Sequence, residues 1–124
     1  QWQVVYQSRS GPPQMPWLEP DICDHLDELA SDGFEQVTVV PLGFVSDHWE
    51  VLFDLDTQAA QRAAELWLCF QRAATVGNDA HFVSMIRQLV DERINDGTPL
   101  HLGRSGPWPD NCPEGHCVPA RPTA

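Results

Sequence analysis

The stretch Pro41-Leu-Gly-Phe-Val-Ser-Asp-His-Trp-Glu-Val-Leu-Phe-Asp-Leu-Asp56 joins the two patterns that decide the fold. Val37 to Leu42, at its start, is almost continuously apolar, as a strand of a parallel sheet covered on both faces should be. Later in the stretch, apolar residues begin to recur at helical spacing, which predicts a helix from about His48 to Leu66. Four acids and one histidine therefore crowd at the carboxyl end of a predicted strand, where open α/β sheets place their ligand crevices.

Further elements on both sides extend this alternation. Trp2–Gln7 is rich in β-forming residues and predicts a short strand. Asp21 opens a helix that Gly33 ends, and Leu68–Arg72 is a second extended segment. A last helix is expected over Ala80–Arg93, with an inward face of Phe82, Met85, Ile86, Leu89 and Val90.

This order predicts an α/β fold, a partial Rossmann-like lobe with parallel strands and right-handed crossover helices. Two or three strands leave an open sheet edge, which folded proteins normally cover. We therefore expect the chain to be part of a larger α/β unit. Residues 1–98 form the predicted domain, and the Pro- and Gly-rich residues 99–124 an irregular, flexible tail.

The composition excludes several classes of function. Asp and Glu total 18 against 7 basic residues, all of them Arg, and the formal net charge is −11. Nucleic-acid binding needs clustered cations, so it is not expected. No apolar run approaches the roughly 20 residues that span a bilayer, so we expect no transmembrane segment and a cytoplasmic protein.

The four cysteines divide into two pairs. Cys23 and Cys69 lie in predicted regular elements and are expected to be free, buried thiols. Cys112 and Cys117 lie in the tail with the spacing C-x4-C. A cytosolic setting makes disulfides a poor default for either pair.

The acidic row has two readings that the residues alone leave open. Asp47 and Glu50 have the spacing of a helix capping box, in which each side chain bonds a free backbone N–H. That reading does not explain Asp54 and Asp56. Glu50 and Asp54, one turn apart, would repel by about 2–3 kcal/mol at roughly 6 Å and an effective dielectric near 20. In a cleft, a cation or a bound proton must offset this repulsion, and His48 adds a nitrogen ligand or base.

Four segments together resemble ferrochelatase, the enzyme that inserts ferrous iron into a porphyrin in haem biosynthesis. They are Tyr6–Gly11, Pro16–Asp21, Pro41–Asp56 and Arg72–Phe82, and the match runs over about residues 2–95. The sequences of the first two segments are similar to those of the actinobacterial branch. That branch resembles the enzymes that metallate coproporphyrin III rather than protoporphyrin IX.

The resemblance implies a role for each matched position. Glu50 matches the active-site glutamate, assigned to iron binding or to accepting pyrrole protons, and His48 is its neighbour in catalysis and metal binding. Asp54 continues the row thought to guide metal or relay protons. Trp17 matches a tryptophan that lines the porphyrin cleft. Gln58 departs from the pattern, because many relatives have a carboxylate there.

The resemblance also implies what this chain lacks. It corresponds to the carboxyl-terminal half of the enzyme, so the first lobe, with the iron-ligating histidine and the porphyrin clamp, would be a missing partner. We expect the isolated chain to have little chelatase activity.

Some family members carry a [2Fe–2S] cluster on a C-x-C-x4-C tail. Cys112 and Cys117 fit the x4 pair, Asp110 replaces the first cysteine, and His116 could supply a ligand.

Two other hypotheses remain. The chain could be a non-catalytic acidic module that binds metal or a tetrapyrrole, encoded by a partial gene. It could also belong to a related chelatase for cobalt or nickel.

Overall fold

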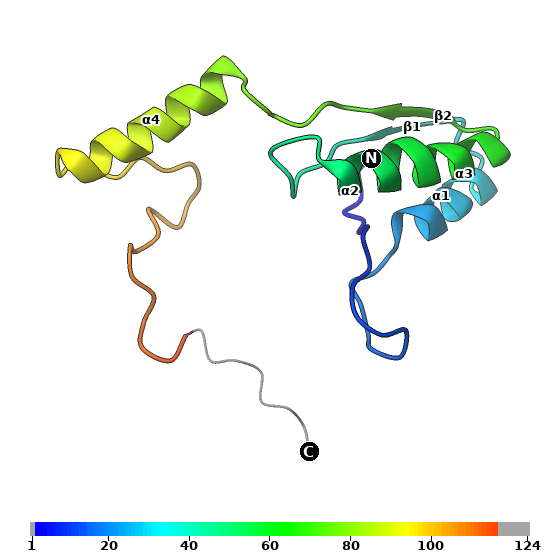
Figure 1. Ribbon diagram of the computed structural model, residues 1–124, viewed down its shortest axis with the longest axis horizontal. Helices are drawn as coiled ribbons and strands as arrows, with labels where there is room; N and C mark the ends of the chain where they lie inside the picture. Colours follow the sequence, from blue (N-terminus) through cyan, green and yellow to red (C-terminus); the bar gives the residue numbers. More distant parts are fainter. Residues whose placement is uncertain (1, 117–124) are drawn as a thin grey trace. The chain divides into compact units, whose positions relative to one another are not determined.

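The computed structural model describes residues 2–116, which belong to two compact units, Gln1–Asp79 and Ala80–Ala124. The first unit contains every strand of the described chain and all helices except the last (Figure 1). Helices and a two-stranded parallel sheet make up its fold, so the predicted α/β class is confirmed.

Helix α1 (Ile22–Ser31) forms where its signals predict it. Asp21 is the N-cap, and its carboxylate accepts the backbone N–H of Cys23 at 2.8 Å. This bond satisfies one of the free donors at the helix start. Gly33 follows the helix with a φ of +81°, a left-handed conformation that suits glycine. The apolar face of α1 buries Ile22 and Leu26.

The second predicted helix is continuous but changes its winding. It consists of α2 (Trp49–Phe53), a π-helical segment η1 (Asp54–Ala59) and α3 (Ala60–Glu65). Apolar residues spaced by four drift around an α-helix, which has 3.6 residues per turn. The wider π turn, with its i to i+5 bonds, reverses that drift. The row of Val51, Leu55, Ala59 and Ala63 consequently stays on one face, and each of its members is at most 1% exposed.

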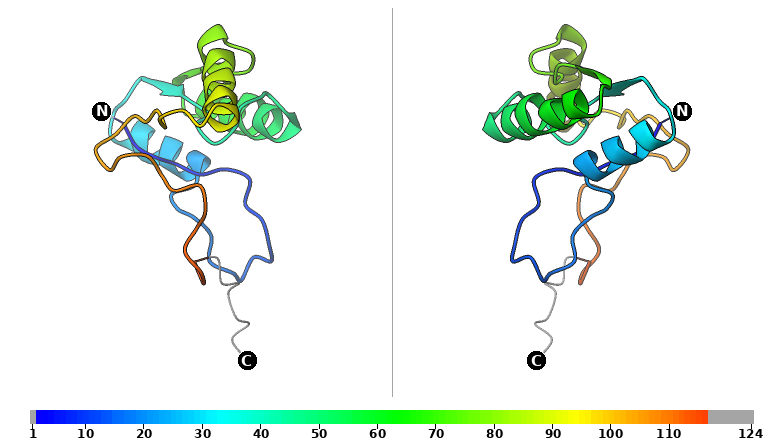
Figure 2. Two further views of the ribbon diagram at one scale, coloured as in Figure 1. Left: turned by 90° about the vertical axis from the view of Figure 1, so that its left-hand side faces the viewer. Right: turned by 90° about the vertical axis from the view of Figure 1, so that its right-hand side faces the viewer.

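Strands β1 (Gln36–Val39) and β2 (Cys69–Arg72) pair in parallel, with Gln36 opposite Cys69 and Val39 opposite Arg72. Figures 1 and 2 show α1 and the helical segment on one side of this pair. Val37 of β1 packs against their common core, as Val39 does.

The expectation that this strand is covered on both faces was wrong for the described chain. Gln36 and Thr38 on the opposite face are exposed, and the apolar run leaves the strand after Val39, so that Val40 and Leu42 are exposed in the following loop.

The N-terminal segment differs from its prediction. Residues 2–7 form no strand, and only Tyr6 makes a bridge, in parallel with Asp21. Its N–H donates to the Pro20 oxygen and its carbonyl accepts the N–H of Ile22, both at 2.9 Å. A groove of about 770 Å³ lies between residues 2–7, α1 and residues 36–44. The segment therefore lacks a partner strand among the described residues, although its sequence favours β structure.

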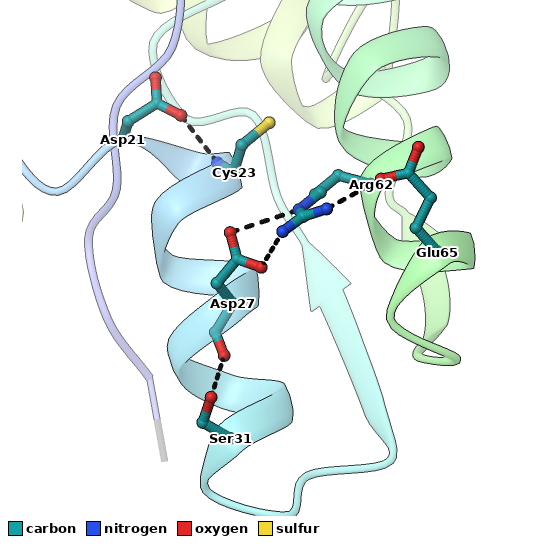
Figure 3. A network of polar contacts seen from close by, with 6 residues as sticks. All are labelled: Asp21, Cys23, Asp27, Ser31, Arg62 and Glu65. Atoms are coloured by element: carbon teal, nitrogen blue, oxygen red, sulfur yellow. Dashed lines mark hydrogen bonds and ion pairs between the residues drawn. The ribbon is translucent and has the colours of Figure 1, made fainter.

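An arginine joins helices α1 and α3 of the first unit. Arg62 of α3 binds the carboxylate of Asp27 on α1 through two of its nitrogens, and Glu65 through the third at 2.9 Å (Figure 3). About two fifths of the side chains of Arg62 and Asp27 are exposed, so this is a surface network. Such pairs contribute little to stability individually.

The second unit contains α4 (Ala80–Ile94), close to its predicted bounds. Its predicted inward face was wrong, because Met85, Ile86, Leu89 and Val90 are all more than 40% exposed. Glu92 is instead the buried residue, and its carboxylate accepts the N–H of Leu100 at 3.0 Å. The described residues after α4 form no helix or strand.

No helix in residues 2–116 is long and apolar enough to cross a membrane.

Candidate functional site

The acidic row lies at the carboxyl ends of both strands. Val39 and Arg72, paired in register, are the last residues of β1 and β2. The loop of residues 40–48 leaves β1 here and leads into α2. Arg72, at the end of β2, contacts Asp47 and Asp56, so these two acids lie near the carboxyl ends of the strands.

The capping-box interpretation of this row was wrong. His48, not Asp47, is the N-cap of α2, and no side chain caps that helix. The Asp47 carboxylate instead accepts a hydrogen bond from Arg72 Nη1 at 2.9 Å. A charged guanidinium is a stronger donor than a backbone N–H, which explains why the carboxylate points to it.

Arg72 connects two of the four acids. Besides Asp47 it binds both carboxylate oxygens of Asp56 in η1, one of them through Nη2 at 2.8 Å. Only 13% of the Arg72 side chain is exposed. The hydrogen bonds from Arg72 lower the pKa of Asp56, and those from Asp56 raise the pKa of Arg72. Asp47 and Asp56 thus share a single, largely covered cation, which offsets one of their two negative charges.

His48 is held from its own loop. Its ring meets the Phe44 ring edge to face, with centroids 4.4 Å apart, and Phe44 packs against the hydrophobic core. The backbone N–H of His48 donates to the Ser46 oxygen at 2.9 Å. The imidazole is therefore placed by the core through an aromatic contact.

Glu50 and Asp54 are in different surroundings. Asp54 is half-buried and accepts a hydrogen bond from the Ser8 hydroxyl. Glu50 is exposed, and among the described residues its carboxylate has no hydrogen-bond or ion-pair partner. It is the acid of the row best able to meet an incoming ligand.

No ready-made metal cage exists in the described chain. Among residues 2–116, no three His, Cys, Asp or Glu side chains gather closely enough to hold a metal ion. His48, Glu50 and Asp54, the residues predicted to bind metal, are therefore not gathered into one such group.

Aromatic rings border the acidic row. Trp49 and Phe53 stack on one another with centroids 6.0 Å apart and an interplanar angle of 14°. They are 78% and 41% exposed, and they flank Glu50 along α2. Trp17 lies in the loop before α1 and is 40% exposed, and no ring contact joins it to these two within residues 2–116. The chain thus offers a flat apolar surface beside a free carboxylate.

The cysteines depart from their predictions. Cys69 is exposed, because its side chain projects from the uncovered face of the sheet. Cys23 is half-buried, and burial, followed by nearby acids, raises the pKa of its thiol.

Cys112 is a free, exposed thiol, and Cys117 lies outside the described residues. An iron–sulfur cluster needs four ligands, and the described residues include no group that fits one.

Sequence reasoning missed Arg72 and Ser8. Each is far from the acids along the chain, 16 residues for Arg72 and Asp56 and 46 for Ser8 and Asp54. The only available signal was electrostatic, since a crowded acidic row implies a nearby cation.

Comparison with known proteins gives a consistent result. The family model described as Ferrochelatase matches residues 1–94. The chain is 54% identical over 125 residues to the coproporphyrin III ferrochelatase of Streptomyces coelicolor, covering 97% of this chain and 33% of that protein. It is 55% identical over 120 residues to the protein of the same name from Frankia alni, covering 96% and 31%. A ferrochelatase from Rhodopirellula baltica is 48% identical over 125 residues, covering 98% and 36%. The chain thus spans about a third of the length of these relatives.

Proposed function

This chain belongs to the ferrochelatase family, and we propose that it forms the carboxyl-terminal part of an enzyme that inserts ferrous iron into a porphyrin in haem biosynthesis. The observation that carries the proposal is Glu50, a carboxylate without a partner among residues 2–116, on the helix that carries the exposed, stacked rings of Trp49 and Phe53. The names of several relatives favour coproporphyrin III as the porphyrin.

In this proposal Glu50 is the general base. Metal insertion requires that two pyrrole N–H groups lose their protons, and a free carboxylate can accept a proton that is brought within hydrogen-bond distance. His48, the residue at the start of the same helix, would receive a proton or contact the iron through its imidazole. Ferrous iron accepts mixed carboxylate and imidazole ligands, which suits this pair.

Asp54 would extend the route. It lies one turn beyond Glu50, and its bond from Ser8 leaves its carboxylate with further acceptor capacity. The i, i+4 relation brings the two carboxylates near enough to pass a cation or, through water, a proton. Gln58 lies four residues after Asp54, but its amide cannot accept and release a proton as a carboxylate does, so it would not extend this route.

The aromatic residues would hold the flat macrocycle. Trp49 and Phe53 present apolar rings on the helix that carries Glu50, and aromatic stacking favours a planar conjugated ligand. Trp17 would contribute from the loop before α1. Substrate binding would thus depend on rings that are at present exposed to water.

The rest of the enzyme is the proposed partner, and the groove beside β1 supports this. The N–H of Cys69 in β2 donates to the Glu35 oxygen at 2.8 Å. Because backbone groups alternate along a strand, those of Gln36 and Thr38 point to the opposite edge, away from β2. That edge borders the groove, whose other wall is the segment 2–7. An extended segment from the remainder of the enzyme could lie in this groove and form backbone hydrogen bonds with β1 and with residues 2–7.

The test is a chelatase assay with ferrous iron and coproporphyrin III, on the chain supplemented with the remaining two thirds of the Streptomyces coelicolor relative. Glu50→Gln should reduce turnover by about 10²- to 10⁴-fold, the usual contribution of a general base. Glu65→Gln, a change on the Arg62 network, is the matched control and should leave turnover unaltered.

Three results would count against the proposal. Equal turnover by Glu50→Gln and the unaltered protein would remove Glu50 from catalysis. Porphyrin binding without turnover in the complemented protein would favour the non-catalytic binding module. Faster insertion of cobalt or nickel than of iron would favour a different chelatase.

A further inference from the structure

Arg72 contacts both the loop before α2 and the π-helical segment. Its guanidinium donates to Asp47 in the loop and to Asp56 in η1, and Nη1 also donates to the Ala73 oxygen at 3.2 Å. Every one of its nitrogens is therefore engaged. Arg72 is the last residue of β2, so its contacts connect the loop and η1 to the sheet.

The loop that Arg72 reaches is anchored to the core by Phe44, but the residues between Phe44 and His48 have few other contacts. Val45 accepts the N–H of Gly77 at 2.7 Å, and the His48 N–H donates within the loop itself. Val45, Ser46 and Asp47 are all exposed, so little packing holds this part of the loop. Asp47 is the residue directly before His48, and Glu50 follows two residues later. The backbone that enters α2 at His48 is thus joined directly to the residue that Arg72 holds.

Arg72 also divides the acidic row into two kinds of carboxylate. Asp47 and Asp56 share the guanidinium, whereas Glu50 has no partner in residues 2–116 and Asp54 has only a neutral hydroxyl. A cation entering the row would meet two carboxylates that already have a counter-charge and two that do not. Electrostatic attraction is then strongest at Glu50 and Asp54.

We infer that Arg72 is a positioning residue, which ties the loop of residues 40–48 to η1 and reserves Glu50 and Asp54 for the incoming cation. The structural half of this inference concerns the tie itself and is independent of the reaction. The functional half deepens the proposed iron insertion and rests on it.

The tie is tested on the 124-residue chain by amide hydrogen exchange. Arg72→Gln should accelerate exchange of the His48 and Gly77 amides about tenfold. Losing a hydrogen bond to a charged group typically changes an equilibrium constant by about tenfold or more, and the opening of the loop should change accordingly. Arg62→Gln is the matched control, because Arg62 also binds two carboxylates, but between α1 and α3 (Figure 3). It should leave both amides unaffected. Unaltered exchange in Arg72→Gln would overturn the inference.

Two further variants distinguish loss of this contact from general unfolding of the chain. Asp47→Asn removes only the loop end of the tie and keeps the Arg72 contact to Asp56, and it should accelerate the same two amides. Arg72→Lys should not restore the protection, since a single ammonium cannot reproduce the fork that reaches both carboxylates. Full protection in Arg72→Lys would show that charge alone suffices and would contradict the geometry.

The functional half is tested in the complemented enzyme. Arg72→Gln should lower kcat about tenfold while KM for the porphyrin changes less than twofold, because the rings that would bind the macrocycle are untouched. An unaltered kcat would refute the positioning role even if the loop loosens. Absence of turnover in the unaltered protein would refute the proposed reaction, and the tie would then be judged by the exchange data alone.

Discussion

The two faces of the helical segment Trp49–Glu65 have opposite roles. One face carries an apolar row, Val51, Leu55, Ala59 and Ala63, which is almost completely covered. The other face carries the acids of the candidate site, most of them open to water. The two faces carry different residues of one continuous helical segment, which includes the π-helical η1.

This contrast shows how the chain separates its tasks. The covered row provides the burial free energy that holds α1, the helical segment and the sheet together. The acidic residues contribute little to that total, and Arg72 holds two of them, Asp47 and Asp56. Stability and function can therefore be altered independently by changes on the two faces.

The largest expected effect is on the covered row. Leu55→Ala should lower the free energy of unfolding by about 2–5 kcal/mol, because Leu55 is 1% exposed and its loss leaves a cavity. Urea unfolding followed by circular dichroism measures this change. Leu42→Ala, at a residue 86% exposed, should alter it by less than about 0.5 kcal/mol. Similar losses in both variants would show that the row is not the core.

Adding volume to the same row should destabilise the chain by a smaller amount. Ala59→Leu at the end of η1 should cost about 1–3 kcal/mol, because the site is fully covered and has no room for three more carbons. Ala64→Leu on the exposed side of α3 serves as the control for helix propensity. A stable Ala59→Leu variant would mean that the π segment can rotate to accommodate it.

Acid should weaken the Arg72 contact on the other face by less still. Arg72 lowers the folded-state pKa of Asp56, so its stabilising contribution is complete above the ordinary aspartate pKa near 3.9 and is lost as pH falls through the lowered value. Because Asp56 is 39% exposed, the effect should stay below about 1 kcal/mol. Unfolding curves between pH 5 and 2 should show a smaller decline for Asp56→Asn than for the unaltered chain. Parallel declines would argue against the contact.

The smallest expected effect is on stability at Glu50. Glu50→Gln should leave the unfolding free energy within about 0.5 kcal/mol, because the side chain is exposed and has no partner in the described residues. Thermal unfolding measures this directly. A clearly destabilised variant would mean that Glu50 supports the fold, and a loss of turnover could then no longer be assigned to chemistry.

Sequence patterns predicted the helices and the second strand well. Periodicity located α1, the helical segment and α4 to within a few residues, since these depend on local spacing and capping. The sequence patterns failed where strand formation or burial depends on a second segment packing against the first. Residues 2–7 have β-forming side chains but no neighbouring strand among the described residues. Cys69 lies in an extended segment whose outer face is uncovered.

The sequence indicated which residues to consider for the candidate site, but it did not indicate their contacts. Glu50, His48 and Asp54 were identified from residue types and their resemblance to a family, and their roles stay predictions. The competing capping box failed because Asp47 found a stronger donor in Arg72, which local spacing cannot reveal.

By itself, the sequence determined the alternation of elements, the apolar row spaced by four and the gathering of acids after β1. These are local properties that follow from side-chain chemistry and helical or extended geometry. Only the tertiary structure decided which acids bind a cation, because that depends on Arg72 reaching across 16 and 25 residues of chain to Asp56 and Asp47. The range of a hydrogen bond is a few ångströms in space, and only the folded chain sets which residues lie that close.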